Sequence, residues 1–116
     1  MKIYNRIKGT KGEINATTFL KKKKYRILET NYTNSFGEID IICQDKDFIV
    51  FVEVKQKSTL QFGLPREMVD KRKQQKIGRV ASAYLKKNRL TDYPCRFDVV
   101  EIIDDKINYI ENAFEL

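Results

Sequence analysis

Hydrophobic and polar positions alternate along the chain with the two periods that distinguish strands from helices. Apolar residues at every second position predict a strand, and apolar residues at every third or fourth position predict a helix. The predicted helices cover Thr10–Lys23 and Arg66–Lys87, and the predicted strands cover Tyr25–Tyr32, Glu38–Cys43, Phe48–Lys55, Arg96–Ile103 and Ile107–Ile110. The order is therefore one helix, three strands, one helix and two strands.

The segment Phe48–Lys55 is apolar on both faces over most of its length. Ile49 and Phe51 alternate in it with Val50 and Val52. A strand that is apolar on both sides belongs in the middle of a sheet that helices cover. The sequence therefore predicts an α/β fold with a mixed central sheet flanked by helices, and we treat residues 1–116 as one domain.

Charged residues interrupt the apolar pattern of two neighbouring strands. Glu53 and Lys55 stand at the end of the central strand. In the strand before it, alternation predicts Ile39 and Ile41 on one face and Asp40 on the other. Burying an unpaired charge is costly, so such groups are normally paired or coordinate a metal ion. We therefore expect the carboxylates of Asp40 and Glu53 to converge beside Lys55.

Two carboxylates beside one lysine have a definite chemical use. Their oxygens suit a hard cation such as Mg²⁺ or Mn²⁺, which keeps bound waters and engages phosphate oxygens. Such an ion polarises a phosphodiester and lowers the pKa of a bound water, which a desolvated Lys55 could orient or deprotonate. The alternative is a structural ion pair of Lys55 with Asp40 or Glu53, since structural networks also cluster charges.

Glu13 has two interpretations. It shares one helical stripe with Ala16 and Leu20, which would direct its carboxylate toward the sheet and give it an auxiliary role in the site. Alternatively it forms a capping box, in which its carboxylate accepts a hydrogen bond from the backbone N–H of Thr10.

Two lysines flank the apolar stripe of the second predicted helix. Lys73 falls between Val69 and Ile77 in steps of four residues, and Lys76 stands four residues before Val80. A lysine that extends from such a stripe toward the charged edge of the sheet can reach a phosphate of a nucleic acid. A packed stem with a solvated ammonium group is the alternative for both.

Composition narrows the classes of function. Twenty-three Lys and Arg against 16 Asp and Glu leave a net charge of +7, which favours polyanionic partners such as nucleic acids. The sequence has no histidine, which excludes histidine triads, imidazole proton shuttles and most zinc chemistry. The longest apolar run, Phe48–Val52, is far shorter than the ~20 residues of a membrane-spanning helix. We expect a cytoplasmic protein without membrane contact.

Two segments of the chain match the motifs of a known family in residues and in spacing. They are Gly37-Glu38-Ile39-Asp40-Ile41-Ile42 and Phe51-Val52-Glu53-Val54-Lys55. They resemble the YraN-like family of small bacterial proteins, which is placed in the PD-(D/E)XK nuclease superfamily near archaeal Holliday junction resolvases. The resemblance covers nearly the whole chain. Further positions that fit the family are Gly12-Glu13, Ala16, Leu20, Asn31-Tyr32, Val69, Lys73 and Arg96-Phe97-Asp98-Val99-Val100.

The resemblance implies a restriction-endonuclease-like αβββαβ core with a metal site. By it, Asp40 and Glu53 would hold the metal ion and Lys55 would be the catalytic lysine. Some superfamily members add a glutamate from the first helix, which matches Glu13. Lys57 stands where an arginine often follows the catalytic lysine, and we expect it to contact nucleic acid. Because resolvases of this superfamily act as dimers, the resemblance also implies a homodimer.

The residues and the resemblance together predict a Mg²⁺-dependent nuclease that hydrolyses phosphodiester bonds of DNA, with branched or damaged DNA as candidate substrates. Lys73, Lys76 and the basic surface would hold the strand. The first alternative is a catalytically inactive nucleic-acid-binding module of the same fold. The second is a scaffold protein whose basic face docks an acidic protein.

Overall fold

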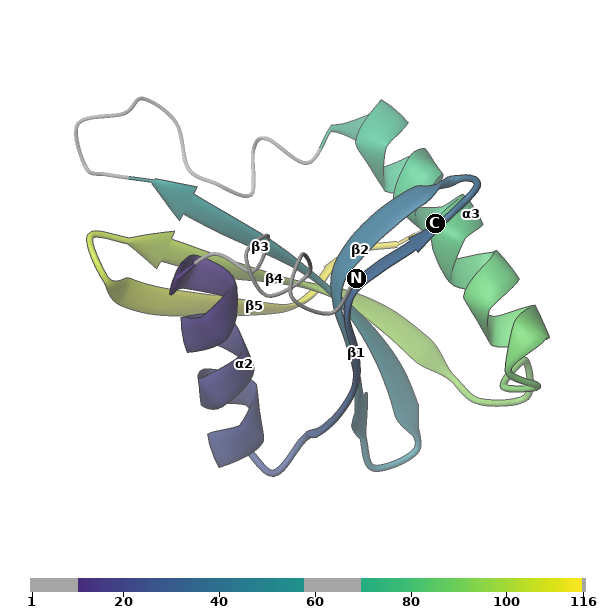
Figure 1. The fold of residues 1–116 in the computed structure, drawn as a ribbon, viewed down its shortest axis with the longest axis horizontal. Helices are drawn as coiled ribbons and strands as arrows, with labels where there is room; N and C mark the ends of the chain where they lie inside the picture. The colour runs from purple at the N-terminus through teal and green to yellow at the C-terminus, as the bar shows by residue number, and fades with distance from the viewer. Residues whose placement is uncertain (1–10, 58–69, 116) are drawn as a thin grey trace.

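A five-stranded mixed sheet forms the centre of the protein. The computed structural model describes residues 11–57 and 70–115. They form α2 (Lys11–Lys22), β1 (Arg26–Asn34), β2 (Gly37–Asp45), β3 (Phe48–Lys57), α3 (Lys71–Lys87), β4 (Cys95–Ile103) and β5 (Lys106–Phe114). The strands lie side by side in chain order, with β3 and β4 parallel and the other neighbours antiparallel (Figure 1). This arrangement confirms the predicted α/β class and element order, and it is compatible with a restriction-endonuclease-like core.

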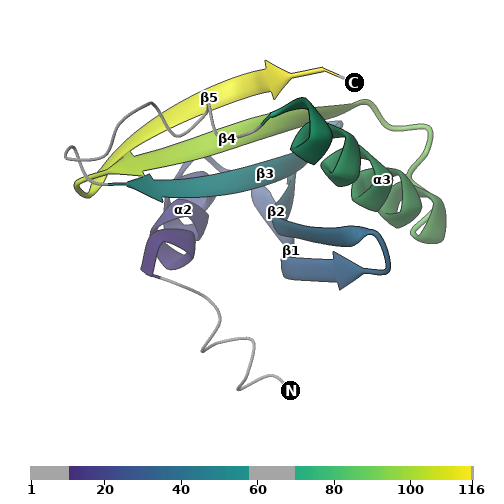
Figure 2. The same cartoon turned by 90° about the horizontal axis from the view of Figure 1, so that it is seen from above.

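The two helices cover opposite faces of the sheet (Figure 2). Ile49 and Phe51 of β3 pack in one hydrophobic cluster with Tyr84 of α3. Val50 and Val52 pack in the other cluster, which contains residues of α2. Because successive side chains of a strand point to opposite faces, β3 is buried between both clusters, as its apolar pattern predicted.

Helix α3 begins later than the sequence predicted. Asp70 has an extended backbone (φ −76°, ψ 176°), and its carboxylate accepts a hydrogen bond of 2.9 Å from the backbone N–H of Lys73. Asp70 is therefore the N-cap, and an unbroken helix from Arg66 is wrong at this end. Thr10 of the predicted capping box and Val69 of the predicted stripe lie outside the described residues.

The first residues of β2 do not follow the predicted alternation. Ile39 packs in the cluster of α3, whereas Ile41 packs in the cluster of α2, so the prediction that both share one face is wrong. The pairing of β2 with β3 ends at Ile41 and Val52, but its pairing with β1 continues to Gly37. The start of β2 therefore separates from β3 and stays with β1. Strict alternation assumes a strand that is paired evenly along its length.

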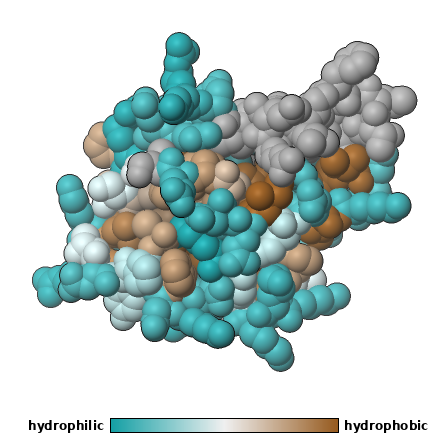
Figure 3. All heavy atoms as spheres, turned by 180° about the vertical axis from the view of Figure 1, so that it is seen from behind, coloured by the Kyte–Doolittle hydropathy of each residue, from teal (hydrophilic) through white to brown (hydrophobic). Residues whose placement is uncertain are grey.

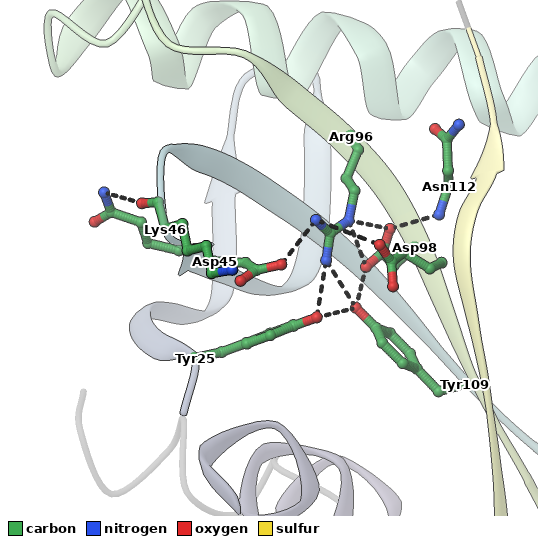
Figure 4. A network of polar contacts seen from close by, with 9 residues as sticks. Tyr25, Asp45, Lys46, Arg96, Asp98, Tyr109 and Asn112 are labelled. Carbon is green, nitrogen blue, oxygen red and sulfur yellow. Dashed lines mark hydrogen bonds and ion pairs between the residues drawn. The ribbon is translucent and has the colours of Figure 1, made fainter. Parts of the chain in front are cut away.

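A buried arginine connects several elements on the α2 side of the sheet (Figure 4). Arg96 of β4 is 7% exposed, and its Nε lies 3.2 Å from both carboxylate oxygens of Asp98, which is fully buried. The remaining guanidinium nitrogens donate to Asp45 at 3.0 Å, to the Tyr25 hydroxyl at 3.0 Å and to the Tyr109 hydroxyl at 3.3 Å. Arg96 and Asp98 thus form a structural pair that links β4 to β2, to β5 and, through Tyr25, to the connection between α2 and β1.

The same aspartate anchors the end of β5. The backbone N–H of Asn112 donates to Asp98 at 2.8 Å, and Asn112 has a left-handed φ of 55°. The pairing of β4 with β5 shifts between Phe97 and Val99, as at a β-bulge. Beyond this bulge β5 continues to Phe114, whereas the sequence predicted that the strand would end at Ile110.

The surface of the molecule is largely hydrophilic. In the view from behind, hydrophilic side chains project around the outline, and apolar residues form patches between them (Figure 3). Large apolar side chains with substantial exposure are Ile14, Phe36, Phe48 and Tyr93. In the described parts of the chain, neither helix has the length and hydropathy needed to cross a membrane.

We expect Asp98→Ala to destabilise the fold by about 3–5 kcal/mol, because it removes the main partner of a buried guanidinium group. The exposed Glu111, which lies 3.7 Å from the same guanidinium group, provides the matched control. Glu111→Gln should change stability by about 0–1 kcal/mol. Urea denaturation followed by circular dichroism measures both, and a loss below about 1 kcal/mol for Asp98→Ala would contradict this role.

Candidate functional site

The separation of β2 from β3 places Asp40 at an open edge of the sheet. Its Oδ2 accepts a hydrogen bond of 2.8 Å from the backbone N–H of Val54, which lies beyond the last residue of β3 that pairs with β2. The Asp40 carboxylate thus accepts a hydrogen bond from a backbone N–H of β3 that has no backbone partner in β2. This contact fixes Asp40 beside the end of β3, where Glu53 and Lys55 emerge.

Glu53 accepts two ammonium groups on one carboxylate oxygen. Its Oε2 lies 3.1 Å from Nζ of Lys55 on the same strand and 2.6 Å from Nζ of Lys73 on α3. The Glu53 side chain is 9% exposed, whereas that of Lys73 is 38% exposed. Glu53 and Lys55 therefore form the predicted contact. Lys73 extends from α3 and forms an ion pair with the same carboxylate.

Glu13 of α2 reaches the same edge from the other face of the sheet. Its carboxyl group lies close enough to that of Asp40 to raise the pKa of Asp40. Asn31 of β1 turns the nitrogen of its side-chain amide toward Glu13. This nitrogen donates to both carboxylate oxygens of Glu13, at 3.1 and 3.3 Å. Glu13 therefore lies toward the site, as its stripe predicted.

Burial and neighbouring charge change the protonation of Asp40. Burial raises the pKa of this carboxyl group most, and the negative charges of Glu53 and Glu13 raise it further, to about 7. The hydrogen bond from Val54 acts in the opposite direction. Like charges that are held together in a desolvated place disfavour ionisation. The cluster of Asp40, Glu53 and Glu13 thus has an excess of negative charge.

The two lysines shift in opposite directions. Burial lowers the pKa of Lys55, and the nearby Lys73 lowers it further, although Glu53 opposes both effects. Burial is the largest effect on Lys73 and lowers its pKa, but the hydrogen bond with Glu53 and the negative charges of Glu53 and Asp40 together outweigh burial and raise the pKa. Lys73 is therefore held as a cation, while Lys55 is moved toward the neutral form that can accept a proton.

A cleft of about 340 Å³ opens beside this cluster. It is lined by Thr33, Gly37, Glu38, Asp40, Glu53, Lys73, Lys76 and Ile77, which come from the β1–β2 hairpin, β3 and α3. Lys76 packs along Gly37, whose φ of +146° favours glycine. The two predicted metal ligands and two of the predicted nucleic-acid-binding lysines thus share one cleft. The side chain of Lys57 lies outside the described part of the structure.

A larger groove of about 700 Å³ lies between α3 and the ends of β4 and β5. Apolar residues such as Leu85 and Phe114 line much of it, and Glu111 and Glu115 lie at it. It contains none of the residues that the sequence predicted for the site. The smaller cleft is therefore the better candidate, because the charged cluster opens into it.

The donor atoms at the cleft fit a hard divalent cation. Asp40 and Glu53 provide carboxylate oxygens, and Mg²⁺ usually binds one or two carboxylates and completes its shell with waters and phosphate oxygens. Within residues 11–57 and 70–115, no group of three or more His, Cys, Asp or Glu side chains is arranged to hold a metal ion. The fit therefore rests on two protein ligands and on the excess negative charge that raises the pKa of Asp40.

Two polar residues near the cluster were missed by reasoning from residue patterns. Asn31 has a left-handed φ of 53° inside a strand, a conformation that costs energy for a residue other than glycine. Glu101 of β4 is 1% exposed, lies beside Lys55 in the sheet register and accepts a hydrogen bond of 2.7 Å from Asn108. A single acidic residue in the apolar run of β4 was the available signal for Glu101.

Comparison with known proteins gives one family. The model of the uncharacterised protein family UPF0102 matches residues 12–102. A UPF0102 protein of Acetivibrio thermocellus is 50% identical, over 94% of this chain and 92% of its own length. Similar proteins of Clostridioides difficile and Persephonella marina are 48% and 42% identical, and each match covers at least 95% of both chains. All three carry only the family name.

We expect Asp40→Asn to stabilise the metal-free protein at pH 8 but not near pH 4. Because the folded pKa of Asp40 lies above its unfolded value, the folded state binds more protons, and stability falls as the pH rises from about 4 to about 7. The amide removes this loss and still accepts the Val54 hydrogen bond. The gain at pH 8 should be on the order of 2–4 kcal/mol.

Denaturation in the presence of EDTA at pH 4.5, 6 and 8 measures this effect. Asp47→Asn is the matched control, because Asp47 is an exposed aspartate in the turn after β2. A stability difference that grows with pH only for Asp40→Asn is expected. Lower stability of Asp40→Asn at pH 8 would show that the carboxylates are not in electrostatic conflict.

Proposed function

The chain belongs to the uncharacterised protein family UPF0102, and we propose that it is a metal-dependent nuclease that hydrolyses phosphodiester bonds of DNA. The observation that carries this proposal is the meeting of Asp40, Glu53 and Lys55 at one edge of the sheet, beside an open cleft. The family confirms the YraN-like resemblance. Membership of the PD-(D/E)XK superfamily is part of the proposal.

Asp40 and Glu53 would hold Mg²⁺ or Mn²⁺, which when bound polarises the phosphodiester and lowers the pKa of a water. Lys55, whose pKa burial lowers, is suited to take a proton from the attacking water at its Nζ. Asn31 positions Glu13 beside Asp40, where Glu13 raises the pKa of Asp40. These groups come from four elements, α2, β1, β2 and β3, so the fold itself assembles the site.

The basic surface supports a nucleic-acid substrate. Lys73 and Lys76 line the cleft into which the carboxylates open, and the whole chain carries a net charge of +7. Lysines beside a carboxylate cluster offset the repulsion between the cluster and a phosphate backbone. DNA is the polymer that the resemblance implies, and branched or damaged DNA enters the proposal on the same ground.

The test is a cleavage assay with purified protein, Mg²⁺ or Mn²⁺, and duplex, single-stranded and junction DNA. We expect metal-dependent cleavage of at least one substrate, with a loss of about 10²-fold or more in Asp40→Asn and in Lys55→Met. Binding of the same DNA should survive in both variants. Asp47→Asn should cleave as the wild type does.

Absence of cleavage of every substrate by folded protein would contradict the nuclease proposal. In that case, DNA affinity that falls steeply with salt and does not respond to Lys55→Met would identify the inactive nucleic-acid-binding module. Cleavage that Asp40→Asn leaves unchanged would equally exclude this site and point to a contaminating nuclease.

A further inference from the structure

Helix α3 begins with a charge pattern that its own dipole opposes. Its first turn carries Lys71, Arg72 and Lys73, and no acidic residue. Because the N-terminus of a helix is its positive end, cations there are unfavourable. Lys73 is additionally placed at the edge of the apolar stripe, with its ammonium group in the cleft rather than in open solvent. The Asp70 carboxylate compensates the end of the helix, but the Lys73 ammonium group in the cleft needs an anion of its own.

Glu53 supplies this anion at short range. Nζ of Lys73 lies 2.6 Å from Oε2 of Glu53, closer than the 3.1 Å of Lys55 to the same oxygen. Charge-assisted hydrogen bonds of this length are among the strong ones in proteins. The oxygen that Lys73 occupies belongs to one of the two proposed metal ligands.

Two ammonium groups already lie on this oxygen, so a divalent cation bound to it would be strongly repelled unless one of them left. Lys73 is the one that can leave, because its side chain is 38% exposed and that of Lys55 only 15%. We propose that Lys73 competes with the divalent cation for Glu53 and, once displaced, contacts a phosphate of the bound DNA strand. This inference rests on the proposed function and adds a role in which one lysine couples the metal site to the substrate.

The surroundings of Lys73 favour the second position. Its side chain is 38% exposed, so it has room to move, and it lines the same cleft as Lys76. Asp70 already caps the helix N-terminus through the backbone N–H of Lys73, so the side chains of Lys73 and Lys76, and not the helix end, would hold the phosphate. A phosphate in the cleft would therefore replace Glu53 as the counter-ion of Lys73.

Metal affinity without DNA is the first test. Mn²⁺ binding, followed by the electron paramagnetic resonance signal of the free ion, should be about tenfold tighter in Lys73→Gln than in the wild type. Lys73→Arg keeps the charge and the competition, so its affinity should stay within about twofold of the wild type. Lys76→Gln controls for the general loss of a positive charge in the cleft and should change the affinity by about twofold or less.

Thermal stability gives a readout that is independent of activity. Metal-free Lys73→Gln should melt below the wild type at pH 8, because the carboxylates lose a counter-ion, and Mn²⁺ should raise its melting temperature more than that of the wild type. DNA affinity in Ca²⁺ should change in the opposite direction to metal affinity. Lys73→Gln should bind a DNA duplex about tenfold more weakly than Lys73→Arg.

The outcomes separate this inference from the proposed function. Suppose that Asp40→Asn removes Mn²⁺ binding, but Lys73→Gln leaves it unchanged or weakens it. This result would overturn the proposed competition between Lys73 and the metal ion, while the metal site itself would stand. Unchanged DNA affinity in Lys73→Gln would overturn the transfer to phosphate. Failure of both the wild type and Lys73→Gln to bind Mn²⁺ would overturn the inference together with the proposed metal site.

Discussion

Three carboxyl groups that approach one another at the edge where β2 separates from β3 are the constraint on which the candidate site depends. Asp40, Glu53 and Glu13 come from β2, β3 and α2, so the conflict between their charges is built into the packing of the sheet against its helices. Burial intensifies this conflict, because it removes the water that would screen it. The raised pKa of Asp40, which favours its neutral form, and the two ammonium groups on Glu53 are the means by which the fold reduces it.

The protein contains a second buried charged network, and the contrast between the two is informative. Around Arg96, one guanidinium group is matched by Asp98 and Asp45 and by two tyrosine hydroxyls, and the network lies largely buried between the elements that it joins. Such a network, closed between the elements that it joins, specifies structure. The carboxylate cluster instead opens into a cleft, which is the arrangement expected where an added cation and a phosphate can reach the charged groups.

Much of the fold followed from short-range periodicity. The central position of β3 came from apolar residues on both of its faces, and the meeting of Glu53 with Lys55 came from their spacing of two on one strand. The direction of Lys73 followed from its place in the helical stripe. These features depend on local geometry, which the sequence pattern carries directly.

Other features depend on contacts between distant segments, and local patterns do not encode them. The twist that moves Ile39 to the α3 side arises because β2 keeps its pairing with β1 after leaving β3. Asn31 takes a left-handed conformation and contacts Glu13 only because β1 passes close to α2. Glu101 gains its place beside Lys55 from the parallel register of β3 and β4.

The central claim is that Asp40 and Glu53 hold one divalent cation, and anomalous diffraction from a crystal soaked in Mn²⁺ tests it most directly. We predict a peak about 2.0–2.3 Å from an oxygen of each residue. A well-ordered site with both carboxylates in place and no such peak would contradict the account.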